Sequence, residues 1–306
     1  MGAFIVRRLY YGLYVVLGVT IVVFVVTRVI GDPVSAMLPM ESSAAQRAAF
    51  AQQLGLDRPL YVQFFDFLGN VARLNLGDSL WQHRPVTQIV FEKLPMTLYL
   101  VAAGMTLAIA LAIPLGIMAA LKPGGLVDRV TVLLSLLGLS VPQFWLGLLL
   151  IIVFAVDLKW LPTSGSGDLK HMVLPAVTLA LPALTRMVMV IRSAMMDELN
   201  AQYIKVATAK GLPFRRVVGV HALRNITVPV MTLAGWEVIR ALAGYSVVVE
   251  TVFAWPGLGL AAMQAIERQD LILLQGIVFY IAILVVIVNI ALDVAQKLVD
   301  PRVKFT

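Results

Sequence analysis

The chain has 306 residues, of which 60% are apolar and only 13% are charged, and its mean hydropathy is +0.91. Soluble domains carry about 25% charged residues, so the composition excludes a soluble globular protein and indicates an integral membrane protein. The absence of cysteine excludes disulfide scaffolds and thiolate chemistry, and the three histidines lie far apart, so no metal site is expected.

Six stretches are long and apolar enough to cross a bilayer core, which needs about 20 helical residues. Four contain no charged residue: Leu9–Thr27, Met96–Leu121, Val130–Val156 and Leu271–Leu292. Two contain charges: Met172–Ile191 with Arg186, and Ile226–Ala254 with Glu237, Arg240 and Glu250. We therefore expect an all-α, polytopic membrane protein with six transmembrane helices. Prolines in the second, third and fourth spans free backbone groups and offer bends: Pro114, Pro142, Pro175 and Pro182.

The distribution of basic residues predicts the orientation. With the N-terminus inside, most of the 24 Lys and Arg residues fall on the cytoplasmic side, Arg186 and Arg192 among them. Basic residues next to short loops stay cytoplasmic, so both termini are expected inside. The first apolar stretch is longer than the h-region of a secretory signal, which spans about 7–15 residues. We expect it to remain as an uncleaved first span.

The expected organisation has three parts. Residues 1–30 form a tail and the first span, residues 31–95 form an outer, periplasmic helical region, and residues 96–306 form a core with five further spans. In the outer region Ser43 and Gln46 resemble a capping box, whose helix ends near Gly55. A second helix beginning at Pro59 has one apolar face: Leu60, Phe64, Phe67, Leu68 and Val71. This region is expected to pack on the ends of the spans; a lid or docking surface is the alternative.

The cytoplasmic segment 192–225 is the most informative part of the chain. A helical run from Gln202 to Lys210 stops at Gly211, a favourable left-handed C-cap residue. Pro213 is well placed to begin the next helix. Tyr203, Val206, Ala207 and Lys210 share one face of the short helix, and small neighbours keep its profile low. Such a helix can enter a cleft of another protein; an amphipathic helix lying on the lipid surface is the alternative.

The motifs of this segment resemble the EAA loop of permease subunits in binding-protein-dependent ABC importers. The matching residues are Ala207-Thr208-Ala209-Lys210-Gly211-Leu212-Pro213 and His221-Ala222-Leu223-Arg224-Asn225. The resemblance extends along the chain to the dipeptide, oligopeptide and nickel branch, and to its subunit with a long first outer region. Further matches are Leu54-Gly55-Leu56-Asp57-Arg58-Pro59, Leu76-Gly77-Asp78-Ser79, Pro85-Val86, Leu94-Pro95-Met96-Thr97-Leu98, Val249-Glu250-Thr251-Val252-Phe253, Pro256-Gly257-Leu258-Gly259 and Asp300-Pro301-Arg302.

The resemblance implies a type I ABC importer permease fold in a bacterial inner membrane. It implies a heterodimer with a second permease subunit, two ATPase subunits that bind ATP and Mg²⁺, and a periplasmic or lipid-anchored binding protein; no nucleic acid partner is expected. The ATPase-coupling residues would be Tyr203, Lys205, Val206, Ala207, Thr208, Ala209, Lys210, Gly211, Leu212 and Pro213. The chain departs from the general pattern, because Lys205, Val206 and Ala207 stand where Glu-Ala-Ala is usual.

This chain is not expected to be an enzyme. It contains no Gly-x-x-x-x-Gly-Lys-Ser/Thr phosphate loop and no His-Glu-x-x-His motif, so we assign no catalytic residue and no cofactor of its own. An ion-coupled secondary transporter is the main rival, although such proteins usually contain inverted repeats. The cargo expected from the resemblance is a di- or oligopeptide, with nickel chelates, glutathione or another small solute as alternatives.

Ionisable residues within spans are costly and indicate function by default. Glu237 and Arg240 are three residues apart, hence on one helical face. They are either an ion pair that makes burial tolerable or part of the translocation pathway. Glu250, near the outer end of the same span, is expected to snorkel or to serve an outer gate.

Overall fold

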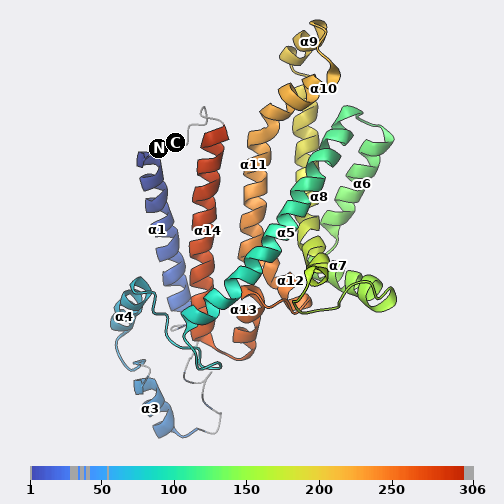
Figure 1. Ribbon diagram of the computed structural model, residues 1–306. Coiled ribbons are helices and arrows are strands. Elements are labelled where there is room, and N and C mark those ends of the chain that lie inside the picture. Colours follow the sequence, from blue (N-terminus) through green and yellow to red (C-terminus); the bar gives the residue numbers. More distant parts are fainter. Residues whose placement is uncertain (1, 28–33, 35–37, 39–41, 54, 300–306) are drawn as a thin grey trace. The chain divides into compact units, whose positions relative to one another are not determined.

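The structure is a computed structural model that describes residues 2–27, 34, 38, 42–53 and 55–299 (Figure 1). Its named elements are all helical, which confirms the all-α prediction. The chain divides into two compact units, one of residues 1–97 and 256–287 and the other of residues 98–255 and 288–306. The motif at residues 300–302 and the start of the outer region at residues 31–33 lie outside the described residues.

Among its described residues, the first unit contains three complete named helices from the N-terminal part of the chain, one short helix from the C-terminal part, and the beginnings of two long helices. The complete ones are α1 (Gly2–Val25), α3 (Ala44–Gln53), α4 (Leu60–Ala72) and α13 (Leu258–Glu267). The long helices α5 (Val86–Leu121) and α14 (Leu271–Val299) start in this unit and continue into the second.

The capping box of α3 is formed as the sequence predicted. The Ser43 backbone N–H donates to the side-chain oxygen of Gln46 at 2.9 Å, and the Gln46 N–H donates to the Ser43 hydroxyl at 3.3 Å. After α3, Gly55 has a φ of +66°, which glycine adopts without steric cost. Helix start and helix end thus follow from local chemistry alone.

Helix α4 packs against α1 through aromatic side chains. The Phe24 ring lies 5.2 Å from the Phe64 ring and 5.8 Å from the Phe67 ring, centroid to centroid. Val71, on the same face of α4, is buried. This is the packing predicted for the apolar face of the outer region.

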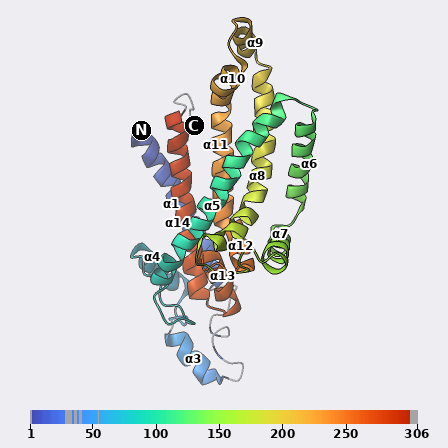
Figure 2. The same ribbon diagram turned by 45° about the vertical axis from the view of Figure 1, so that its right-hand side comes forward.

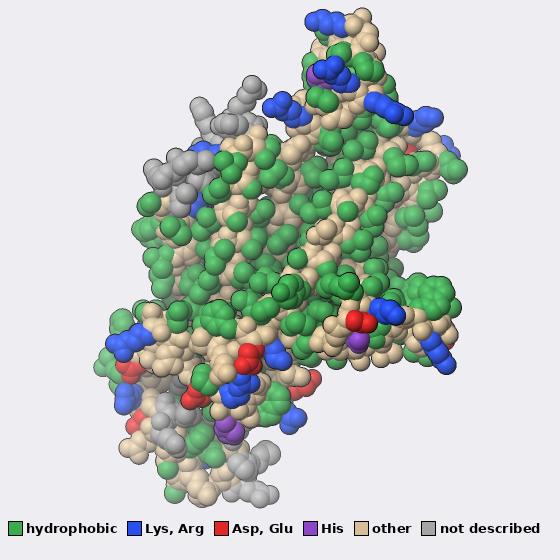
Figure 3. All heavy atoms as spheres, viewed as in Figure 1, with side chains coloured by type: hydrophobic (Ala, Val, Ile, Leu, Met, Phe, Trp, Pro, Cys, Tyr) green, Lys and Arg blue, Asp and Glu red, His purple; other side chains and the backbone are tan. Residues whose placement is uncertain are grey.

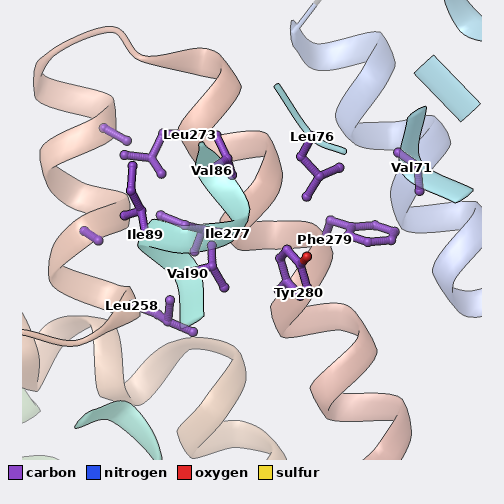
Figure 4. Close-up of a cluster of buried hydrophobic side chains, with 12 residues drawn as sticks. Val71, Leu76, Val86, Ile89, Val90, Leu258, Leu273, Ile277, Phe279 and Tyr280 are labelled. Atoms are coloured by element: carbon purple, nitrogen blue, oxygen red, sulfur yellow. The ribbon is translucent and has the colours of Figure 1, made fainter. Parts of the chain in front are cut away.

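A cluster of buried apolar side chains, which we call the outer cluster, holds the first unit together (Figure 4). It joins the start of α5 to α13 and α14, with Val86, Ile89, Leu258, Leu273 and Ile277 at most 1% exposed. Gly276 permits this approach, because a Cβ there would stand 2.2 Å from a methyl carbon of Val86. The cluster forms a rigid base for the segments that surround it.

The second unit contains the remaining helices. They are α6 (Leu126–Ser140), α7 (Gln143–Leu150), α8 (Leu169–Leu199), α9 (Gln202–Ala209), α10 (Phe214–Arg216), α11 (Leu223–Arg240) and α12 (Ser246–Val252), with π-helical turns at Ile151–Asp157, Val217–Ala222 and Ala241–Tyr245. Helix α8 is the centre of the unit, because α6, α7, α11 and α12 all pack against it. More than half of its most apolar stretch is buried in the chain.

Five helical segments among the described residues can cross a membrane by length and composition: Val6–Val25, Val86–Leu121, Leu169–Leu199, Phe214–Val252 and Leu271–Val299. They correspond to five of the six predicted spans, two of which were predicted to end two residues later than the observed segments. The sixth, predicted as an unbroken stretch at Val130–Val156, is instead a pair of helices bent by 103°. The number of spans is therefore six only if this bent pair counts as one.

The bend occurs where the sequence places Pro142. Val141 takes an extended conformation with a ψ of 122°, as expected before proline, and the Pro142 residue then starts α7. Both views show the chain turning sharply between α6 and α7 (Figure 2). Helix α6 alone has 15 residues, about 22 Å of helix, less than the bilayer core of about 30 Å. The proline was noted in the sequence, but the size of the bend was not anticipated.

Candidate functional site

The predicted coupling segment folds as a short helix, a tight corner and a second helix. Helix α9 ends at Ala209, and Gly211 follows with a φ of +77°. The Gly211 N–H donates to the Thr208 carbonyl at 3.0 Å, and the Leu212 N–H donates to the Ala207 carbonyl at 3.3 Å, which closes the helix end. Pro213 then caps α10. The corner predicted from glycine and proline is confirmed.

Helix α9 lies beyond the ends of α8 and α11 (Figures 1 and 2). Its inward side is apolar: Ile204 and Ala207 are 5% and 9% exposed and belong to one buried cluster with Met195 and Val217. Ala207, which helical geometry placed beside Tyr203 and Val206, thus faces the chain itself. This buried side fixes the position of α9 on the second unit.

The opposite side of α9 is free of contacts that would bury it. Tyr203 and Val206 are 39% and 53% exposed, and Lys205, Thr208 and Lys210 are also exposed. Basic side chains gather at this end of the molecule (Figure 3). The exposed ones are Lys205, Lys210, Arg215, Arg216 and Arg224. The segment therefore presents a small surface that combines apolar and positively charged groups.

A polar triad ties α9 to both of its neighbouring helices. The Tyr203 hydroxyl donates to the Glu198 carboxylate of α8 and accepts a bond from the Asn225 amide of α11 at 2.8 Å. Asn225 also donates to Glu198 at 3.2 Å. Burial, together with the hydrogen bond to Glu198, raises the pKa of Tyr203 above its usual value. Sequence reasoning missed this triad, whose only signal was the polar character of the three residues.

Glu237 is the centre of a second site, which we call the charge cluster. Its side chain is 1% exposed and pairs with Arg240 at 3.1 Å, as the spacing of three residues predicted. A second arginine, Arg186 of α8, makes a two-pronged pair with the same carboxylate at 2.8 and 2.7 Å. One carboxylate thus faces two guanidinium groups, and the cluster has a net charge of +1.

Arg186 lies within a helix long enough to cross a membrane, in agreement with its place in the predicted span Met172–Ile191. It was grouped with the cytoplasmic basic residues, but it lies 17 residues from the start of α8 and 13 from its end, about 26 and 20 Å of helix. Its guanidinium stands over the Tyr245 ring, 5.6 Å from the centroid. A charge at this depth is tolerated because it is paired and stacked.

For Glu250 the structure contradicts one of the two predicted roles. Its side chain is 0% exposed within α12, so it does not snorkel to a membrane surface. It takes no part in the ion pairs that Glu237 makes with Arg186 and Arg240. The coupling segment is likewise separate from the charge cluster, because Glu198 and Arg186 are 12 residues apart on α8, about 18 Å.

A third ionic contact lies between the two sites along α8. Arg192 makes a two-pronged pair with Asp128 at the start of α6, one arm measuring 2.8 Å, and the Gly124 N–H donates to the same carboxylate at 2.8 Å. Asp128 is 4% exposed. This pair is balanced in charge, unlike the cluster at Glu237. Within the described residues no group of three or more His, Cys, Asp or Glu could hold a metal ion.

Several helices long and apolar enough to cross a membrane are typical of a polytopic membrane protein. Two family models match the chain. The "binding-protein-dependent transport system inner membrane component" matches residues 112–305, and its N-terminal counterpart matches residues 1–101. The chain therefore belongs to the family of inner membrane components of binding-protein-dependent transport systems. It is the permease subunit of an ABC importer and a multi-pass inner membrane protein.

Similar proteins agree over the full length. The chain is 36% identical to the oligopeptide transport system permease protein AppB of Bacillus subtilis (strain 168), covering 100% of both chains. It is 39% identical to the di/tripeptide transport system permease protein DppB of Pseudomonas aeruginosa (strain UCBPP-PA14), covering 99% of both. It is 34% identical to the glutathione transport system permease protein GsiC of Salmonella choleraesuis (strain SC-B67), again covering 99% of both.

A solved structure shares the fold. Inward-facing conformations of the MetNI methionine ABC transporter match with TM-scores of 0.58 and 0.59 at 17% and 19% sequence identity. The match covers 69% of this chain and 96% of that one. At this identity the likeness concerns the fold alone, and it confirms the ABC importer permease fold predicted from the sequence.

Proposed function

We propose that this permease imports short peptides across the inner membrane, by alternating access powered by separate ATPase subunits. The names of the relatives support the cargo, because oligopeptide, di/tripeptide and glutathione permeases are all at least 34% identical to the chain. Glutathione is itself a tripeptide, so these cargoes share one chemistry. Nickel chelates, the remaining alternative, have no support among these relatives.

The observation that carries the proposal is the construction of α9. Its buried side is anchored to the second unit, whereas Tyr203, Val206 and Lys210 stand free at one end of the molecule. A helix lying on lipid would show a broad apolar face with Trp, Phe or Leu. The exposed side of α9 instead has two large side chains, Val206 and Tyr203, next to lysines, and the Tyr203 hydroxyl is hydrogen-bonded to Glu198. Such a surface suits a cleft in a protein.

The partners follow from this arrangement. Two ATPase subunits bind ATP and Mg²⁺ and receive α9 on the cytoplasmic side, the side to which we also assign both termini. A second permease subunit completes the pathway as a heterodimer, and a binding protein delivers the cargo from outside. This chain binds no cofactor and performs no catalytic step in this scheme.

The charge cluster is the proposed contact with cargo in the membrane. Glu237 is neutralised by Arg186, whereas Arg240 is 47% exposed and makes one bond to Glu237. A peptide in transit carries a carboxylate, which the surplus positive charge attracts without holding it in a closed pocket. Glu250, fully buried in α12, stays a proposed residue of the outer gate.

Cross-linking tests the coupling proposal directly, because the chain contains no cysteine. Val206→Cys and Lys210→Cys, in transporter purified from membranes, should form adducts with the ATPase subunit through a short bifunctional maleimide, and ATP should change the yield. Ser164→Cys, exposed in the loop that precedes α8, is the matched control and should give no such adduct. Adducts with lipid alone, or none with an ATPase, would overturn the coupling role. Identification of the ligand on the cognate binding protein tests the cargo separately.

A further inference from the structure

The first unit contains a polar cavity that the transport route does not use. Its volume is about 380 Å³, and it lies between α4, the segment of residues 75–77 and the first turns of α14. One wall is fixed by the outer cluster, because Leu76 belongs to that cluster, and Phe67 and Ile272 pack against it. The other lining groups are mostly polar: Gly55, Arg58, Gln63, Asp66, Asn70, Asn75, Gly77 and Gln275.

Two buried amide atoms in this cavity lack a partner. Among the described residues, Gln63 Oε1 and Gln275 Nε2 are the buried side-chain atoms without a hydrogen bond, and both residues line the cavity. Gln275 is 7% exposed, hence more than nine-tenths buried. Polar groups buried in this way are normally paired, and leaving them unpaired is costly.

The orientation of Gln63 is fixed by its other atom. Gln63 Nε2 donates to the carbonyl of Leu56 at 3.1 Å and to that of Arg58 at 2.8 Å. The atom left over is therefore the carbonyl oxygen, which needs a donor. Gln275 offers a donor, which needs an acceptor. A single peptide group supplies both, because it carries one N–H and one C=O.

A charged pair on the cavity lining matches the ends of such a ligand. Arg58 and Asp66 are 3.2 Å apart, and their side chains are 59% and 58% exposed. An exposed pair of this kind contributes little to stability, so its two members are available to other charges. A carboxylate can pair with Arg58 and an ammonium group with Asp66.

We propose that this cavity is a binding site for a short zwitterionic peptide, whose amide bonds to Gln63 and Gln275 and whose charged ends pair with Arg58 and Asp66. The site shares no residue with the charge cluster. Its ligand class follows from its own groups, so it stands or falls independently of the transported cargo. Ordered water is the competing occupant.

The test is equilibrium binding of radiolabelled dialanine to the transporter in lipid nanodiscs, with the binding protein omitted. The wild type should bind saturably, and Gln63→Leu and Gln275→Leu should each weaken binding about tenfold, since each removes one hydrogen bond to a buried group. Gln88→Leu changes an exposed glutamine of the same unit that does not line the cavity, and should leave the affinity unchanged.

A change in the ligand gives a second test that needs no variant. Alanyl-lactate, in which an ester oxygen replaces the amide N–H, lacks the donor for Gln63 Oε1. It should bind the wild type about tenfold more weakly than dialanine and should bind Gln63→Leu as well as dialanine does. Equal affinities of the two ligands for the wild type would overturn the proposal, as would undiminished dialanine binding in both leucine variants; either result would leave water as the occupant. Uptake assays on the same variants report on transport independently.

Discussion

Two ionic sites on one helix, α8, are built differently. At Arg192 the pair with Asp128 is balanced, one cation to one anion, and the Gly124 N–H completes the carboxylate's bonds. At Arg186 one carboxylate, Glu237, serves two cations, and the second of them, Arg240, is half exposed. The first site holds α6 against α8. The second holds α11 against α8 and has one positive charge, that of Arg240, in excess of its single carboxylate.

The difference indicates which charged side chains are required to neutralise a buried partner and which are not. Burial of an ion requires a partner, because desolvation costs more than an unpaired charge can recover. Asp128 and Arg192 neutralise each other, with no charge left over. In the charge cluster Arg186 alone would neutralise Glu237, so Arg240 is the residue of that cluster whose charge is not required for folding.

The largest expected effect comes from removing the shared carboxylate. Glu237→Gln leaves two guanidinium groups without their anion inside a membrane span, at a cost of about 4 kcal/mol. The midpoint of thermal unfolding of the purified transporter should fall strongly, or the protein should fail to accumulate. Glu267→Gln, an exposed glutamate at the end of α13, is the control. Equal stability of the two variants would contradict the central role of Glu237.

Breaking the ion pair of Asp128 and Arg192 should reduce the stability of the folded protein slightly less than removing Glu237. Asp128→Asn should destabilise the protein by about 3 kcal/mol, because Arg192 loses its partner while keeping partial access to water. The double variant with Arg192→Gln should recover part of this loss in the same thermal unfolding experiment. Arg129→Gln, which changes the exposed neighbour, should be neutral. If the double variant were as unstable as the single one, the pair would not act as a unit.

Arg240 offers the sharpest contrast between folding and transport. Arg240→Gln should change the unfolding midpoint little, since Arg186 still neutralises Glu237, but should slow uptake in proteoliposomes about tenfold, equivalent to about 1.4 kcal/mol. Arg129→Gln again serves as the control and should transport normally. Unchanged uptake in a fully assembled Arg240→Gln transporter would remove Arg240 from the pathway.

The smallest effect is expected at the exposed start of α8. Asp168 caps the helix by accepting from the Lys170 N–H at 3.1 Å, and its contact with His171 lowers the pKa of its carboxyl below the usual 3.8. A carboxyl with a lowered pKa stabilises the folded state above its unfolded pKa, and this contribution disappears as the pH falls through the lowered value. Asp168→Asn should therefore reduce thermal stability slightly at pH 7, and the difference from the wild type should shrink as the pH falls below the usual carboxyl pKa of 3.8. A constant difference across this range would show that charge plays no part in the cap.

Local patterns in the sequence were sufficient to predict the helices and their ends, but not to predict which residues meet in the ionic sites. The Ser43–Gln46 box, the Gly211 corner and the Glu237–Arg240 spacing each depend on a few neighbouring residues, and each was confirmed. Arg186 reaches Glu237 across 51 positions, a pairing that no local rule supplies. The charge count grouped Arg186 with the cytoplasmic basic residues although it lies within the fourth predicted span, because the sequence did not show that Glu237 is its partner.

The prolines illustrate the same limit. Pro142 ends one helix and starts another, whereas Pro175 and Pro182 lie within an uninterrupted α8. Proline in a helix interior costs about 3 kcal/mol, which α8 offsets through burial among four neighbouring helices. Helix α6 is largely exposed in this chain and has less packing to lose. The outcome depends on tertiary contacts, which the sequence did not disclose.

Helices α8 and α11 are connected by polar contacts at two positions along their length. Glu198 and Asn225 meet through Tyr203 at one end, and Arg186 and Glu237 meet farther along. Contacts at two positions along the helices oppose a change in the crossing angle between α8 and α11, so we expect these two helices to move together when the permease changes state. A gap that admits cargo is then expected to open between other helices.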